Sequence, residues 1–171
     1  IYARKDYDNT PVGLYIDGDT VENFDGDLYI DDDGAILETG GKLDKVYVLT
    51  GSTVEIDTNV KNLYVNAKTD NLTITSGTTV DKLSISSSSA EDSTITNYGT
   101  IKELNTSQDI TVNGNGTINN PTGDGTVTPG DDQKISVKGV SLNKTATTIE
   151  VGKTEKLTAT VTLDNATNKN V

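Results

Sequence analysis

A six-residue pattern recurs along this chain and constrains its fold more than any other feature. The pattern is an apolar residue, two polar residues, an apolar residue, a variable residue and a last apolar residue. Its copies begin at Leu43, Val60, Val80 and Ile101, which are 17, 20 and 21 residues apart, and a further copy begins at Ile118. A unit this short cannot bury its apolar side alone, so each copy must stack on its neighbours. The repeat therefore predicts a β-solenoid.

Each copy predicts short strands separated by a corner. A shorter apolar pair follows each copy, such as Val54 with Ile56 or Leu72 with Ile74, and a Gly, Thr, Ser and Asn-rich turn leads to the next copy. Alternation of this kind is typical of half-buried strands. The two consecutive polar residues break the alternation, so we expect the chain to bend there. About six coils at a strand spacing of ~4.8 Å would form a rod roughly 30 Å long.

The composition along the chain divides it into three predicted parts within an all-β fold. Residues 1–118 are predicted to form a single-chain β-solenoid, similar to a right-handed β-helix, in which residues 1–42 are an irregular cap. Residues 119–133 hold two of the three prolines, three glycines and three aspartates, which predicts a linker. Residues 134–171 form the third part. The architecture of the first part resembles the β-solenoids of bacterial surface proteins.

The third part resembles the first half of a bacterial immunoglobulin-like domain of group 2. The matching phrases occur in order at residues 140–144 (VSLNK), 149–152 (IEVG) and 157–161 (LTATV). The resemblance implies a partial immunoglobulin-like β-sandwich in a secreted or surface-anchored bacterial protein, where such a domain serves as a spacer or an adhesive module. The missing strands would come from further chain or from a neighbouring molecule.

The composition also restricts the function classes. The chain has no Cys and no His, which excludes a disulfide scaffold, a thiol nucleophile, cysteine-ligated zinc and the commonest general base. No apolar run approaches the ~20 residues of a membrane span. Residues 1–118 carry 20 acidic and 8 basic side chains, whereas residues 134–171 carry 3 and 6. The acidic body makes nucleic acid and anionic membranes poor partners and favours cations or basic surfaces.

Tyrosine occupies the variable position of the pattern in four consecutive places. We expect these rings to point outward and to stack between coils; they are Tyr15, Tyr29, Tyr47 and Tyr64. A flat aromatic row would contact a sugar chain or a second protein surface. The other interpretation is a self-supporting ladder in which each ring covers its neighbour.

Aspartates cluster near the start of the chain. Seven lie within residues 17–33, and Asp17, Asp19, Asp31 and Asp33 are the candidate ligands of a Ca²⁺ ion, which prefers carboxylate oxygens. Their spacing differs from the twelve-residue calcium loop, and Asp-Gly is also common in tight turns. A solvated acidic cap is therefore the competing interpretation, and Ca²⁺ is the only cofactor candidate.

Catalysis is the weakest of the functional hypotheses. Right-handed β-helices include enzymes that cleave acidic polysaccharides with a basic residue near carboxylates, but the only arginine here is Arg4. The lysines recur once per coil beside acids, which is typical of a mutually neutralising row; they are Lys45, Lys61, Lys82 and Lys102. The many acidic residues leave paired carboxylates for glycoside hydrolysis open, so a polysaccharide lyase or hydrolase is the least favoured alternative.

The sequence therefore predicts an extracellular bacterial cell-surface protein that is not an enzyme. Its expected role is structural or adhesive, as a component of a surface layer, stalk or fibre. Its expected partners are other surface proteins, glycans or further copies of itself. The second hypothesis is a carbohydrate-binding module that uses the tyrosine row, with or without calcium.

Overall fold

The computed structural model describes residues 2–3, 13–16, 27–31, 35–49, 51, 53–136 and 139–162. Apart from one short 3₁₀ helix, η1 (Ser88–Ala90), the regular elements of these residues are β-strands. The strands are β1 (Tyr2–Ala3), β2 (Gly13–Ile16), β3 (Asp27–Ile30), β4 (Ala35–Val48), β5 (Thr53–Val65), β6 (Asn71–Ile74), β7 (Thr79–Ile85), β8 (Ser93–Asn97), β9 (Thr100–Thr106), β10 (Ile110–Asn113), β11 (Thr117–Ile118), β12 (Pro121–Thr122), β13 (Val127–Pro129), β14 (Lys134–Ile135), β15 (Gly139–Leu142) and β16 (Ala159–Thr162).

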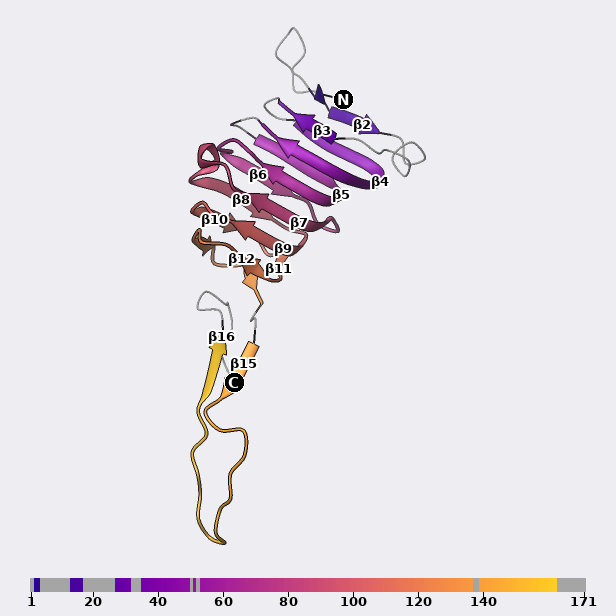
Figure 1. Ribbon diagram of the computed structural model, residues 1–171. Coiled ribbons are helices and arrows are strands. Elements are labelled where there is room, and N and C mark those ends of the chain that lie inside the picture. Colours follow the sequence, from indigo (N-terminus) through magenta and orange to yellow (C-terminus); the bar gives the residue numbers. More distant parts are fainter. Residues whose placement is uncertain are drawn as a thin grey trace.

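Strands β1 to β14 stack in parallel as the coils of a β-solenoid (Figure 1). The first ladder of strands contains β2, the start of β4, the start of β5, β6, β8, β10 and β13. The second contains the middle of β4 and β5, then the start of β7 and β9, then β11 and β14. The third contains β1, β3 and the ends of β4, β5, β7 and β9, followed by β12. The predicted solenoid of about six coils is confirmed.

The core consists of apolar columns that run along the solenoid. Each column takes one residue from every coil, and the backbone register places those residues opposite one another. The second ladder contributes Leu43, Val60, Val80, Ile101, Ile118 and Ile135, each at most 3% exposed. The third contributes Leu28, Val46, Leu63, Leu83 and Leu104, which are all fully buried. The in-phase apolar residues of the sequence are therefore the core.

The two consecutive polar residues of the pattern form a corner, as predicted. In β7, Val80 and Leu83 are fully buried while Asp81 and Lys82 between them are both partly exposed. A straight strand would direct one of these two side chains inward, because successive side chains point to opposite faces. The bend keeps both charged groups in contact with solvent.

Later in the chain, buried polar residues replace apolar ones in two columns. Asn97 lies opposite Ile74 and Thr106 lies opposite Ile85, and both are fully buried. The Asn97 side-chain oxygen accepts a hydrogen bond from Gly99 N at 3.1 Å, and Thr106 Oγ1 donates to the carbonyl of Gln108 at 2.6 Å. These local hydrogen bonds offset the cost of burying a polar side chain.

The solenoid continues through residues 119–133, where the sequence predicts a linker. Ile135 pairs with Ile118, and Val127 pairs with Ile110, so this segment is a further coil. Val127 is 6% exposed, and the buried Gln133 donates from Nε2 to the carbonyl of Gly116 at 3.0 Å. The linker prediction therefore does not describe this segment.

Close stacking explains the glycines of the last coil. A Cβ atom at Gly123 would lie 2.0 Å from the carbonyl oxygen of Thr106, and one at Gly125 would lie 2.2 Å from that of Gln108. Glycine is required wherever backbones approach this closely. Glycine content here reflects tight coils rather than chain flexibility.

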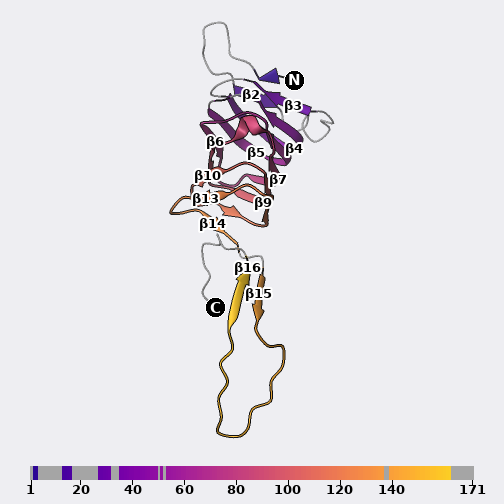
Figure 2. The ribbon, with the colours of Figure 1, turned by 60° about the vertical axis from the view of Figure 1, so that its left-hand side comes forward.

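Strands β15 and β16 form a separate two-stranded antiparallel sheet beyond the β14 end of the solenoid (Figures 1 and 2). Val140 pairs with Val161, and Leu142 pairs with Ala159. Residues 143–158 connect the two strands without forming a strand themselves, so the IEVG phrase at residues 149–152 lies outside any strand. The described residues of the predicted sandwich thus supply one hairpin.

Candidate functional site

Three tyrosines form a stacked column on the outer side of the third ladder. Tyr29, Tyr47 and Tyr64 pair in register on β3, β4 and β5. The ring centroids of Tyr29 and Tyr47 are 4.9 Å apart with an interplanar angle of 12°, and those of Tyr47 and Tyr64 are 4.8 Å apart with an angle of 14°. Each tyrosine is flanked by buried residues, such as Leu63 and Val65, so its own side chain must point outward. We call these three residues the tyrosine column.

Tyr15, the fourth predicted member, does not belong to this column. It lies on β2 and pairs with Glu38 in the first ladder, whereas Tyr29 lies in the third. The local motif Leu14-Tyr15-Ile16 matches that of the other copies, but through-space register decides which residues become neighbours. The prediction that Tyr15 stacks in one row with the other three tyrosines is therefore wrong.

The rings of the column cover one another, and this restricts what they can contact. Stacking on both sides covers both faces of Tyr47. A sugar chain laid along the column would meet ring edges, because the faces that pack against C–H groups are already occupied. The face of Tyr64 directed at the next coil is different, since the residue opposite it there is Ser84.

The carboxylate of Asp27 lies beside the tyrosine column and interacts with its hydroxyl groups. The Tyr29 hydroxyl donates to Asp27 Oδ2 at 3.3 Å. Burial, and then the negative charge of Asp27, raise the pKa of Tyr47 above its usual value. Asp27 also accepts Lys45 Nζ at 3.3 Å, and this pairing raises the pKa of Lys45. Tyr47 and Lys45 therefore keep their protons at neutral pH.

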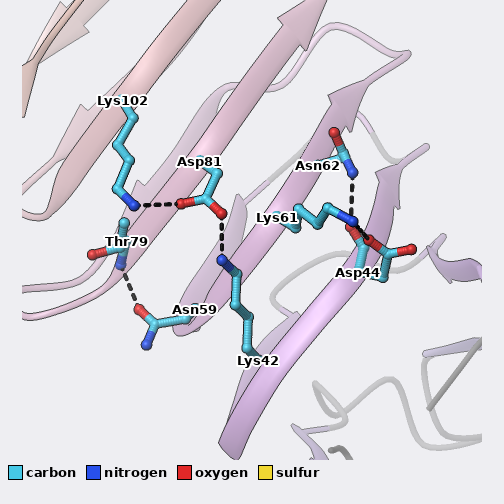
Figure 3. A network of polar contacts seen from close by, with 8 residues as sticks. All are labelled: Lys42, Asp44, Asn59, Lys61, Asn62, Thr79, Asp81 and Lys102. Atoms are coloured by element: carbon cyan, nitrogen blue, oxygen red, sulfur yellow. Dashed lines mark hydrogen bonds and ion pairs between the residues drawn. The ribbon is translucent and has the colours of Figure 1, made fainter. Parts of the chain in front are cut away.

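Acidic and basic side chains at the corners of different coils form ion pairs with one another (Figure 3). Lys61 lies 3.0 Å from Asp44, and Lys102 lies 2.8 Å from Asp81. Lys42 binds the other oxygen of Asp81. These two lysines lower the pKa of the Asp81 carboxyl. The prediction of a mutually neutralising row is confirmed, and these residues serve contacts between coils.

Neutral side chains complete the corner network in Figure 3. Asn62 Nδ2 donates to the carbonyl of Asp44 at 3.3 Å, and Thr79 N donates to Asn59 Oδ1 at 2.7 Å. Each of these bonds joins one coil to the next. The corner thus carries polar contacts along the same direction as the apolar columns inside.

The calcium hypothesis falls mainly outside the described residues. Asp17, Asp19 and Asp33 lie there, while Asp31 is exposed after the end of β3. Within the described ranges, no group of three or more acidic side chains is arranged to hold a metal ion. Calcium binding by the four aspartates stays a prediction.

The basic residues considered for polysaccharide cleavage are Arg4 and the corner lysines. Arg4 lies outside the described residues. The corner lysines that could act on a polysaccharide are each paired with an acid of another coil, for example Lys82 with Glu103 at 3.0 Å. Among the helices that the structure describes, none is long and apolar enough to cross a membrane.

Comparison with known proteins adds no family assignment. No protein-family model matches this chain, and no curated protein or solved structure matches it significantly. The solenoid therefore rests on its own geometry. The resemblance of residues 134–171 to an immunoglobulin-like domain receives no support from a family match.

Proposed function

We propose that this protein is a structural and adhesive component of a bacterial cell surface. The observation that carries the proposal is the continuous stack of coils, with buried columns that run from Leu28 to Ile135. A solenoid of this kind holds its two ends at a separation fixed by the number of coils, because each coil stacks on the previous one at the spacing of paired strands. A stalk or spacer needs this property, and it needs no catalytic group.

The ion pairs between coils support the same role. Lys61 with Asp44 and Lys102 with Asp81 add directional contacts at the coil corners, outside the apolar core. Exposed pairs contribute little individually, but a row of them penalises any shift that would bring like charges together. Such a row suits a rod whose coils must keep one register.

The residues after β14 would supply a module of the immunoglobulin-like type at the end of this rod. The β15–β16 hairpin leaves apolar side chains uncovered, with Val140 and Leu142 each 52% exposed and Leu157 47% exposed. A two-stranded hairpin is marginally stable in water without further strands or packing. We expect additional strands of a sandwich to cover these side chains.

Surface exposure on intact cells tests the proposal. Brief trypsin treatment of living cells that produce the protein should release peptides from the lysine-containing corners, such as those ending at Lys61 or Lys102. Mass spectrometry of the supernatant would identify them, with a cytoplasmic protein as the control for lysis. Recovery of these peptides only after lysis would contradict an extracellular role.

Carbohydrate binding is the second candidate function, and one observation favours binding at the Tyr64 end of the tyrosine column rather than along its whole length. The tyrosine column ends at Tyr64, whose outer face is directed at Ser84 rather than at another ring. Partners of an adhesive stalk would then include glycans.

A further inference from the structure

The tyrosine column stops abruptly between two coils of the third ladder. Tyr47 and Tyr64 stack at 4.8 Å, and the next residue in register after Tyr64 is Ser84, followed by Asn105. A serine side chain is far smaller than a phenol ring. The stack of rings therefore ends at Tyr64 on this side, and Tyr64 and Ser84 are both partly exposed.

The charged neighbour of this position is directed away from Tyr64. Lys82 precedes Ser84 by two residues and points to the same side of β7. Its ammonium lies 3.0 Å from Glu103 in the following coil, on the side opposite to Tyr64. Lys82 is thus held toward β9, on the side of Ser84 that lies away from Tyr64.

The two residues that follow Tyr64 in register are polar and uncharged. Ser84 offers a hydroxyl and Asn105 offers an amide, and each can both donate and accept a hydrogen bond. An aromatic face beside neutral donors and acceptors is complementary to a pyranose ring with equatorial substituents. Such a ring presents C–H groups on its faces and hydroxyls around its edge.

We propose that Tyr64, Ser84 and Asn105 form a binding site for one neutral, all-equatorial pyranose unit of a glycan. The sugar stacks on Tyr64 as the next ring of the column, and its hydroxyls hydrogen-bond to Ser84 and Asn105. The net charge of −12 disfavours acidic polysaccharides. This inference deepens the adhesive role proposed above and rests on it.

The test uses the full chain and cellohexaose, a linear hexamer of β-1,4-linked glucose. Titration followed by ¹H–¹⁵N NMR should produce saturable shifts of the amides of Tyr64, Ser84 and Asn105. Ser84→Ile should weaken binding about tenfold or more, because its side chain covers the face of Tyr64 and offers no hydroxyl. Thr111→Ile is the matched control on the first ladder and should leave the affinity unchanged.

A second variant separates the proposed stacking from an indirect effect on folding. Ser84→Tyr should extend the column by one ring and move the perturbed amides one coil onward, toward Asn105 and Thr122, which are the next positions in register. Thermal melting of each variant should match that of the parent within a few degrees. This readout shows that a change in binding is not caused by unfolding.

Three outcomes would overturn the inference. The first is the absence of saturable shifts with millimolar cellohexaose, and the second is binding that Ser84→Ile leaves intact. Either result would leave the stalk role standing, because trypsin release from intact cells tests that role independently. A galacturonate hexamer that binds more tightly than cellohexaose would also contradict the proposed preference for a neutral sugar.

Discussion

The carboxylate of Asp81 lies 2.8 Å from the ammonium of Lys102 in the following coil, while its other oxygen binds Lys42 from two coils earlier. One acid thus links coils on both sides of its own. The Asp81 side chain is 27% exposed, so solvent screens these contacts only in part. This arrangement makes Asp81 the best single probe of the charged corner.

Replacing Asp81 with Asn should lower the free energy of unfolding by on the order of 0.5–1 kcal/mol near neutral pH. The two lysines lower the pKa of folded Asp81. A lowered folded pKa means that the stabilisation is present above the unfolded pKa of about 3.9 and is lost as the pH falls through the folded value. Urea unfolding of parent and variant should therefore differ at neutral pH and converge in strong acid.

Glu91→Gln is the control for this prediction, because Glu91 is an exposed acid in a turn after η1. It should change stability far less than Asp81→Asn. Molar salt should also narrow the difference between the parent and Asp81→Asn, since ions screen the pairs. A difference that is the same at every pH and salt concentration would show that the loss does not come from charge.

Truncating Leu63 tests the register of the core. Leu63 is fully buried and lies between Val46 and Leu83 of the adjacent coils. Leu63→Ala should cost about 2–5 kcal/mol, because the stacked backbones on either side limit collapse of the cavity. Chemical unfolding would measure it, with Thr73→Ala on the outer side of β6 as the control. Equal stability of the two variants would contradict the assignment.

Much of the fold could be predicted because the positions of the apolar residues in the six-residue pattern indicate directly which side chains are buried. Val80 and Leu83 are buried and Asp81 and Lys82 are not, as the six-residue pattern indicates. The ion pairs of the corner also follow from the recurrence of lysine beside acids. These local signals repeat from coil to coil, so an irregular sequence in one coil has little effect on the predicted fold.

The errors of the prediction come from features that depend on position in space. Tyr15 has the same neighbours in sequence as Tyr29, but β2 pairs in the first ladder and β3 in the third. Stacking of the rings needs register between strands, which a local motif does not contain. The free face of Tyr64 is likewise visible only once Ser84 is known to lie opposite it.

Calcium binding at Asp17, Asp19, Asp31 and Asp33 is tested by thermal unfolding. If these carboxylates hold Ca²⁺ in the folded state, millimolar Ca²⁺ should raise the melting temperature, with the gain growing as the ion exceeds its Kd. Mg²⁺ at the same concentration is the control for general screening of the acidic chain. Identical melting curves in Ca²⁺ and in chelator would dispose of the site.

The extent of the solenoid was the least predictable feature, because glycine, proline and aspartate are common to linkers and to tight turns. The decisive signal is spacing rather than composition. Ile118 and Ile135 are 17 residues apart, as are Ile110 and Val127, and both pairs lie in register. A repeat of this length matches that between Ile101 and Ile118.

Substituting one glycine distinguishes a coil from a linker in this segment. Gly123 has a φ of +101°, and a Cβ there would lie 2.0 Å from the carbonyl oxygen of Thr106. Gly123→Ala should therefore destabilise the last coil by more than the ~1 kcal/mol expected from backbone conformation alone, because two backbones must also move apart. In a linker the same change would be neutral or slightly stabilising.

Gly77→Ala supplies the matched comparison, because Gly77 has a similar φ of +89° but nothing within 4 Å of its would-be Cβ. The two variants share the conformational cost and differ in the steric one. Hydrogen exchange of the amides that bond across the last coil, such as Gly125 N to Thr106 O, should then accelerate in Gly123→Ala and not in Gly77→Ala. Equal hydrogen-exchange rates of these amides in the two variants would contradict a packed coil at residues 119–133 and would favour a linker.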